Sequence, residues 1–131
     1  METTSIEFDY GNRFYGVMHA PRAEINIGNR ENQLSPYDMM FGALSSCLYA
    51  TFLGITYKKK ISFDSARMII TGEKRETIPT TLKWVNIKII IKNPEDEDKF
   101  TKSFELATKY CSVFETIKQV ADMSYEVLFE K

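Results

Sequence analysis

The sequence predicts a single α+β domain in which antiparallel sheets surround a buried helix. Short segments of alternating hydrophobicity occupy both ends of the chain, and a long apolar run with helix signals lies between them. The 131 residues are 44% hydrophobic and include nine Phe and seven Tyr, which is enough apolar volume for one core. Since no repeat, linker or low-complexity segment divides the sequence, residues 1–131 are expected to form one domain.

Three strands are predicted at the N-terminal end. Residues 6–10 and 13–18 flank a Gly-Asn turn, which is a hairpin signal, and residues 23–27 continue the pattern. We therefore expect an N-terminal meander. His19, the only histidine, is most simply interpreted as a strand residue.

A long helix is predicted to begin near residue 35. Ser35 is a good N-cap, Pro36 suits the first helical position, and Asp38 makes the pattern a near relative of the capping box. Lysines at 58–60 suit the C-terminal end, where cations complement the helix dipole. Large apolar residues cover more than one stripe, and small residues would let another backbone come close. We therefore expect this helix to be buried nearly all round.

The second half of the chain predicts two strands, two helices and a closing strand. Residues 65–73 and 82–91 alternate as strands do, with β-branched and aromatic side chains in the second segment. A helix is expected to begin in the acidic run after Pro94, and another at Ser112. Residues 124–129 then form the last predicted strand.

The two cysteines are the residues most able to carry chemistry. Cys47 falls in the middle of the long helix on a row of small residues, which leaves room above its sulfur or only permits tight packing. Cys111 precedes Ser112, which forms a capping-box pattern with Glu115, so Cys111 is expected just outside the first turn of a helix. Amide donors at such a place stabilise a thiolate, and on the residues alone either thiol could be the reactive one.

Charge and composition exclude several classes of function. The net charge of −1 gives no reason to expect a nucleic-acid partner, and the lysines at 58–60 read as a solvated helix end. No segment reads as a signal peptide or as a membrane span, which predicts a cytoplasmic protein without a membrane partner. In that reducing compartment the thiols are expected to cycle. Two cysteines and one histidine make no zinc site, and no cofactor is expected.

Four motifs occur together over nearly the whole chain. They are Ser35-Pro36 followed by an acidic residue, the small-residue helix ending in Ser45-Ser46-Cys47, the segment Lys109-Tyr110-Cys111-Ser112-Val113, and the closing Ser124-Tyr125-Glu126-Val127. In this combination the chain resembles the OsmC/Ohr family, the osmotically inducible protein C and organic hydroperoxide resistance proteins, and most closely the YhfA-like branch. The resemblance implies an OsmC-like intertwined homodimer, in which six-stranded sheets wrap two long central helices and each active site lies at the subunit interface.

The resemblance also implies a thiol peroxidase that reduces organic hydroperoxides in peroxide stress defence. Cys47 would be the peroxidatic nucleophile and become a sulfenic acid, Cys111 would resolve it as a disulfide, and an external dithiol reductant would reset the pair. The family's arginine, which lowers the thiolate pKa, matches Arg13 by its place after a glycine; Arg22 and Arg30 are weaker candidates.

The chain departs from the peroxidases at the residue after the proline. The peroxidases carry a glutamate there, where this chain has Tyr37; Asp38 lies one residue on, about 100° around the helix, and is expected to act mainly as a cap. Tyr37 could donate a hydrogen bond to substrate or merely pack. Met39, Phe41 and Phe114 would line an apolar substrate pocket, or else belong to the core.

The missing glutamate supports a rival hypothesis. Under it the protein is a non-catalytic dimer of the same fold that binds a small apolar ligand or senses redox state through its thiols. Hydrolysis by a nucleophilic cysteine is the weakest alternative, because His19 is the only candidate imidazole and is distant in sequence.

Overall fold

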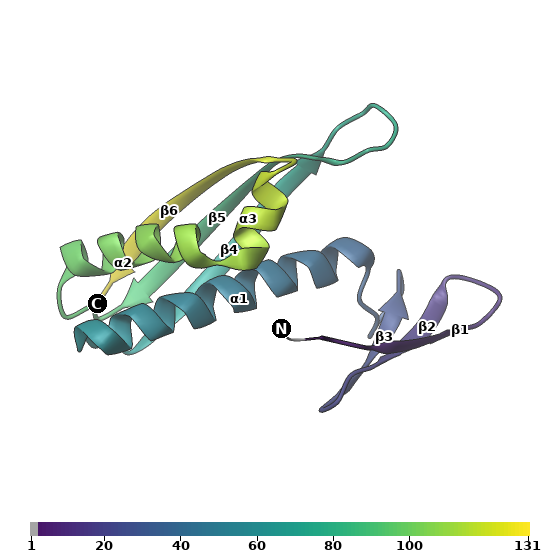
Figure 1. Cartoon of the computed structure of the whole chain (residues 1–131), viewed down its shortest axis with the longest axis horizontal. Coiled ribbons are helices and arrows are strands. Elements are labelled where there is room, and N and C mark those ends of the chain that lie inside the picture. The colour runs from purple at the N-terminus through teal and green to yellow at the C-terminus, as the bar shows by residue number, and fades with distance from the viewer. Residues whose placement is uncertain (1–2) are drawn as a thin grey trace. The chain divides into compact units, whose positions relative to one another are not determined.

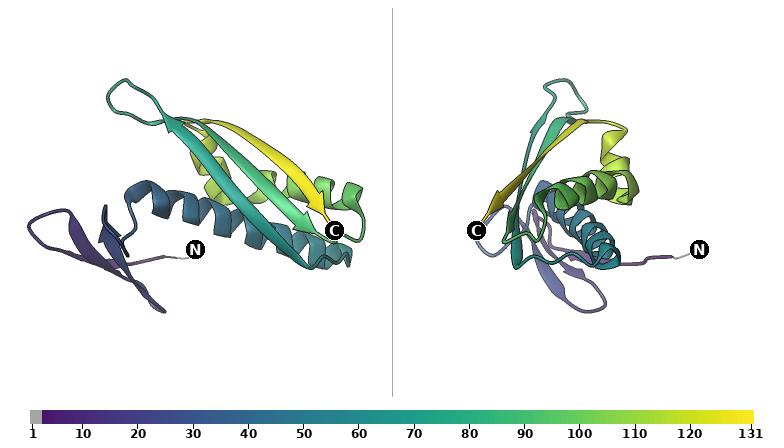
Figure 2. Two further views of the ribbon diagram at one scale, coloured as in Figure 1. Left: turned by 180° about the vertical axis from the view of Figure 1, so that it is seen from behind. Right: turned by 90° about the vertical axis from the view of Figure 1, so that its left-hand side faces the viewer.

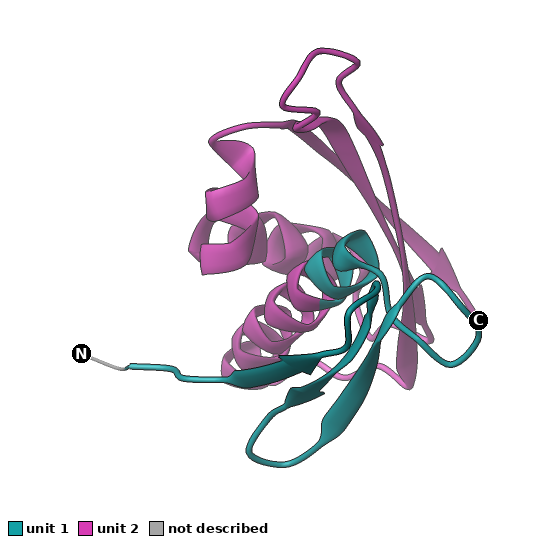
Figure 3. Ribbon diagram, turned by 90° about the vertical axis from the view of Figure 1, so that its right-hand side faces the viewer, with its two compact units in different colours: residues 1–42 teal, residues 43–131 magenta. Residues whose placement is uncertain are grey.

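The computed structural model describes residues 3–131, which contain three helices and two three-stranded sheets. The chain forms two compact units, residues 3–42 and 43–131, shown in teal and magenta in Figure 3. Figure 1 gives the order of the elements along the chain. The α+β class predicted from the sequence is confirmed, and each unit is described below by itself.

The first unit contains an antiparallel meander. Its strands β1 (Glu7–Tyr10), β2 (Tyr15–His19) and β3 (Glu24–Gly28) pair in that order, as predicted. The second strand begins two residues later than expected, because residues 12–14 bend through the turn that joins it to β1. Arg13 therefore lies in a loop and not at the start of a strand.

Helix α1 (Pro36–Lys59) begins in the first unit and continues into the second. The predicted capping box is confirmed in both directions. The Ser35 N–H donates to Asp38 Oδ2 at 2.9 Å, and the Asp38 N–H donates to Ser35 Oγ at 3.4 Å. These hydrogen bonds lower the pKa of the Asp38 carboxyl, so Asp38 acts as the cap of this helix.

One stripe of α1 is buried, and the rest of the helix is not. The buried side chains recur every fourth residue, at Leu44, Leu48, Phe52 and Thr56. Leu53 is 39% exposed and Tyr57 is 86% exposed. The prediction of a helix buried nearly all round is therefore wrong for the single chain, whose other elements cover only one face of α1.

The length and composition of α1 also contradict the expectation that no segment could span a bilayer. The helix has 24 residues and a mean hydropathy of 1.5 over its most apolar window, which meets the requirement for a span. In this chain 22% of that window is buried. Core helices meet the same criterion, so the finding concerns length and composition alone.

The second unit contains a mixed sheet in the order β4 (Ser65–Lys74), β5 (Leu82–Lys92) and β6 (Asp122–Glu130). Strands β4 and β5 are antiparallel, but β5 and β6 are parallel. The expectation of purely antiparallel sheets is therefore wrong for this pair. Its cause is the connection, since the chain crosses over through α2 (Glu97–Tyr110) and α3 (Ser112–Lys118) before β6.

The helices of the second unit lie on one face of its sheet, as both views in Figure 2 show. Strand β5 supplies the centre of that face, with Val85, Ile87, Ile89 and Ile91 all fully buried. Every second side chain of β5 thus points into one core, as the alternation of apolar residues in the sequence predicted.

Aromatic rings hold α1 against α2. The ring of Phe52 lies 5.8 Å from that of Phe104 and 6.1 Å from that of Phe100, and Phe63 completes the cluster at 5.9 Å from Phe52. Such ring pairs add to the free energy of burial. This packing fixes the second half of α1 relative to the first half of α2.

Candidate functional site

The structure brings the two cysteines together within the second unit. Cys47 lies on α1 and is half-buried, whereas Cys111 lies between α2 and α3 and is fully buried. Both are free thiols, and they lie close enough that each shifts the pKa of the other. The pair predicted from the sequence is therefore a pair in space.

Cys111 closes one helix and opens the next. Its backbone is extended, with φ −75° and ψ 114°, and its N–H donates to Ala107 O at 2.9 Å. Its Sγ accepts a hydrogen bond from the Phe114 N–H at 3.4 Å, so the sulfur itself is the N-cap of α3. The predicted cap at Ser112 is wrong, because α2 continues to Tyr110 and the only extended residue between the helices is Cys111.

Hydrogen-bond donors surround the sulfur of Cys47. The backbone N–H of Val113 has the largest effect, and the Cys111 thiol, the Ser112 hydroxyl and the Ser112 backbone add to it. Ser112 Oγ lies 4.0 Å from Cys47 Sγ. Together these donors lower the pKa of Cys47 against the opposing effect of partial burial, since they stabilise the thiolate.

Cys111 has the opposite character. Burial raises the pKa of its thiol to about 11, although the hydrogen bond from Phe114 opposes the change. The neighbouring Cys47 raises that pKa further through its hydrogen bond and its charge. Cys47 is therefore the more easily ionised of the two thiols, whereas Cys111, with a pKa of about 11, stays protonated at neutral pH.

Arg13 lies in the β1–β2 loop of the first unit. It lines a hollow of about 540 Å³ together with Arg30 and the neighbouring residues Asn12, Phe14, Tyr15, Asn29 and Gln33. Arg22 is exposed in the turn between β2 and β3. Since these arginines belong to one unit and Cys47 to the other, the assignment of Arg13 to the sulfur stays a prediction.

Three of the predicted substrate residues lie in the first two turns of α1, within the first unit. The ring of Tyr37 meets that of Phe41 edge-on, with centroids 6.1 Å apart and planes at 73°. Met39 is half-buried. Their contact with a substrate stays a prediction.

Phe114 belongs to the second unit, on α3. It is 5% exposed and lines a hollow of about 430 Å³ between α2, α3 and β6. Lys109, Lys118, Glu105 and Tyr125 line the same hollow. The hollow beside Phe114 was expected to be apolar, but charged side chains line it as well. The role of Phe114 in a substrate pocket stays a prediction.

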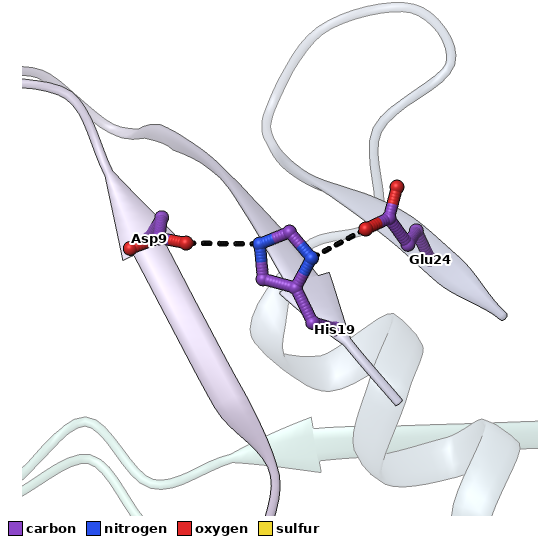
Figure 4. A network of polar contacts seen from close by, with 3 residues as sticks. All are labelled: Asp9, His19 and Glu24. Atoms are coloured by element: carbon purple, nitrogen blue, oxygen red, sulfur yellow. Dashed lines mark hydrogen bonds and ion pairs between the residues drawn. The ribbon is translucent and has the colours of Figure 1, made fainter. Parts of the chain in front are cut away.

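A second polar cluster lies on the meander of the first unit, and sequence reasoning missed it (Figure 4). His19 is a strand residue, as predicted, but its ring bridges two carboxylates. Nδ1 lies 2.5 Å from Glu24 Oε2, and Nε2 lies 2.9 Å from Asp9 Oδ2. The hydrogen bond with Glu24 is the largest cause that raises the pKa of His19. Only the register of the strands places these residues together.

Metal ligation does not account for either cluster. Within residues 3–131, no group of three or more His, Cys, Asp or Glu side chains is arranged to hold a metal ion.

Comparison with known proteins identifies the family. A family model described as OsmC-like protein matches residues 28–126. A hypothetical protein from Aquifex aeolicus VF5 superposes with a TM-score of 0.86 at 24% identity over 100% of both chains. The OsmC like protein from Mycoplasma pneumoniae gives 0.88 at 16% identity, with 99% of each chain covered. An organic hydroperoxide resistance protein OsmC from Legionella pneumophila gives 0.77 at 15% identity, with 98% of each covered. No curated protein sequence matched. At these identities the structures share the fold.

Proposed function

The chain belongs to the OsmC-like protein family, and from that premise we propose that it is a cytoplasmic thiol peroxidase that reduces organic hydroperoxides in peroxide stress defence. The observation that carries the proposal is the cysteine pair. One sulfur is half-buried with a lowered pKa, and the other is buried with a raised pKa directly beside it. A lowered pKa suits the peroxidatic thiol, which attacks as its thiolate, and a thiol directly beside it can resolve the sulfenic acid.

In the first step the Cys47 thiolate attacks the terminal oxygen of the hydroperoxide. The S–O bond forms as the O–O bond breaks, and the electron pair of that bond stays on the departing alkoxide, which takes a proton from water to become the alcohol. The sulfur is oxidised by two electrons to a sulfenic acid, and the peroxide is reduced by two. The donors around Cys47 lower its pKa and so favour the ionised form that attacks.

In the second step Cys111 attacks the sulfenic sulfur of Cys47. The S–S bond forms, the S–O bond breaks, and hydroxide leaves with the proton of Cys111 as water. Oxidation removes the negative charge of Cys47, which is one cause that raises the pKa of Cys111. The resolving thiol is thus easier to ionise once the first step is complete, although its burial still opposes ionisation.

An external dithiol then reduces the disulfide. One thiolate of the reductant attacks the Cys47 sulfur, which breaks the S–S bond and releases Cys111 as a thiol. The second thiolate of the reductant then attacks the reductant's own sulfur in the mixed disulfide, so that Cys47 is released as a thiol and the reductant, oxidised by two electrons, leaves as a disulfide. We assign Cys47 as the entry point because it is half-buried, whereas Cys111 is buried.

The proposal includes an intertwined homodimer. The exposed apolar side chains on α1 support it, since a second copy would cover them. In that assembly Arg13 would serve a Cys47 sulfur of its own or of the second copy, and Tyr37, Met39, Phe41 and Phe114 would line the substrate pocket.

A thiol titration before and after one equivalent of cumene hydroperoxide tests the proposal. We expect both thiols to be lost, and a peptide map to show a Cys47–Cys111 disulfide. Cys47→Ser should abolish peroxide consumption. Cys111→Ser should keep the first step and accumulate a sulfenic acid that dimedone traps. Survival of both thiols in excess peroxide would refute the peroxidase.

A second candidate function is supported by the first turn of α1. Tyr37 stands where the peroxidases have a glutamate, and Asp38 is committed to the cap with Ser35. A dimer without the glutamate could bind a small apolar ligand or sense redox state. Cys47→Ser separates the two functions, because a binding protein would keep its ligand and a peroxidase would lose all turnover.

A further inference from the structure

Ser112 places a hydroxyl beside the proposed nucleophile. Its Oγ lies 4.0 Å from Cys47 Sγ. The sequence predicted that this hydroxyl would cap α3, but the Cys111 sulfur takes that place, so the Ser112 side chain is not used for capping. As the first residue of α3, Ser112 is positioned by the same turn of backbone that positions Cys111.

We propose that the Ser112 hydroxyl is a catalytic hydrogen-bond donor to the Cys47 thiolate. This role rests on the proposed peroxidase function, since it concerns the sulfur that attacks the peroxide. In the peroxidases that this chain resembles, an arginine held by a glutamate stabilises the thiolate, and this chain has Tyr37 in place of that glutamate. Under the proposal, Ser112 on α3 provides part of that stabilisation.

Charge fixes the direction of this hydrogen bond. A thiol and a hydroxyl can each donate, but a thiolate has no proton, so Ser112 donates whenever Cys47 is ionised. Hydrogen bonds to ionised acceptors are stronger than those between neutral groups. The contact of 4.0 Å is long even for sulfur, so we expect an effect near that of an ordinary hydrogen bond.

The same hydrogen bond has two opposite effects on reactivity. It raises the fraction of Cys47 that is ionised, but it lowers the nucleophilicity of each thiolate, which falls as the thiol pKa falls. Removing the donor should therefore slow the reaction at low pH and accelerate it at high pH. A residue that only supports α3 would not produce this crossover.

The experiment measures alkylation of Cys47 by iodoacetamide from pH 5 to 10 in the full chain, with peptide mass spectrometry to locate the product. For Ser112→Ala we expect a rate about two- to fourfold lower below the pKa of Cys47, and about 1.5- to threefold higher above it, from the loss of one hydrogen bond. Ser112→Thr keeps the hydroxyl and should follow the wild-type profile. Thr116→Ala is the matched control, because its hydroxyl is also on α3 but donates to Ser112 O.

A Ser112→Ala profile that superimposes on the wild type would overturn the proposal, and so would uniform slowing at every pH, which indicates displacement of α3. Cumene hydroperoxide consumption is measured on the same samples. If the crossover is present but wild-type protein consumes no peroxide, the donor role to the thiolate stands and the peroxidase function fails. If peroxide is consumed without a crossover on Ser112→Ala, the peroxidase stands and the role of Ser112 fails.

Discussion

The two neighbouring thiols differ in pKa because their surroundings differ. Hydrogen-bond donors dominate at Cys47 and lower its pKa, whereas burial dominates at Cys111 and raises its pKa to about 11. Composition and spacing left open which thiol reacts, since both have donors or small residues nearby. The difference depends on burial, which sequence patterns describe poorly for a residue between two helices.

The first prediction concerns the pH dependence of thiol reactivity. A thiol reacts as its thiolate, so the rate of modification rises as pH rises through its pKa and levels off above it. Because the pKa of Cys47 is lowered and that of Cys111 is raised, Cys47 should be modified first at every pH below about 11. Iodoacetamide with peptide mapping measures both rates, and faster labelling of Cys111 at neutral pH would contradict the assignment.

The second prediction concerns His19. Its two carboxylate partners favour the protonated ring and raise its pKa above the ordinary 6.5. A raised pKa in the folded state stabilises the meander fully below 6.5, and this contribution is lost as pH rises through the folded pKa. In an NMR titration the His19 ring should show a midpoint above 6.5, and Glu24→Gln should lower that midpoint more than Asp9→Asn does.

Glu24→Gln should have the larger effect because the hydrogen bond with Glu24 contributes most to the raised pKa of His19. The side chains of both partners are mostly exposed, so added salt should reduce the shift in each case. A midpoint that neither substitution moves would show that the ion pairs do not persist in solution.

At the scale of elements, local signals predicted most of the structure. Caps, turns and periodicity lie within a few residues of one another, and they located all nine helices and strands within residues 3–131. The direction of β6 was mispredicted because it depends on the crossover through α2 and α3. The cap of α3 was mispredicted because it depends on where the preceding helix ends.

The third prediction concerns the sulfur cap of α3. Replacing Cys111 by Ala removes the acceptor of the Phe114 N–H and should lower the free energy of unfolding by about 1–2 kcal/mol, a typical loss for an N-cap. Cys111→Ser keeps a side-chain acceptor and should lose less. Hydrogen exchange at the Phe114 amide is the direct measurement. Equal exchange rates in the Ala and Ser variants would show that the cap contributes nothing.

At the scale of the whole molecule, burial is what the sequence predicted least well. The apolar residues of α1 predicted a helix covered on all sides, yet only the stripe from Leu44 to Thr56 is covered in one chain. Hydropathy measures how much surface a helix should bury, but not which molecule buries it. The difference between the predicted and the observed burial is therefore itself evidence about assembly.

The fourth prediction uses Gly54, which lies on the exposed side of α1. Apart from the adjacent residues and the nearby backbone of α1 itself, a Cβ at this position would meet no atom of residues 3–131 within 4 Å. In a monomer, Gly54→Leu should therefore stabilise the helix by about 0.8 kcal/mol through propensity alone. If a second α1 packs on this face, the larger side chain should instead separate the helices, because small residues permit close packing.

The sign of the effect decides between the two assemblies. For the intertwined dimer, sedimentation should show a dimer for the wild type and a shift toward monomer for Gly54→Leu, with a lower free energy of unfolding. Lys102→Leu adds the same side chain to the exposed side of α2 and should leave the sedimentation unchanged. A wild-type monomer that Gly54→Leu stabilises would rule out the dimer. The exposed apolar side chains of α1 would then have to be explained by a different partner, because a monomer leaves Leu53 and Tyr57 in water.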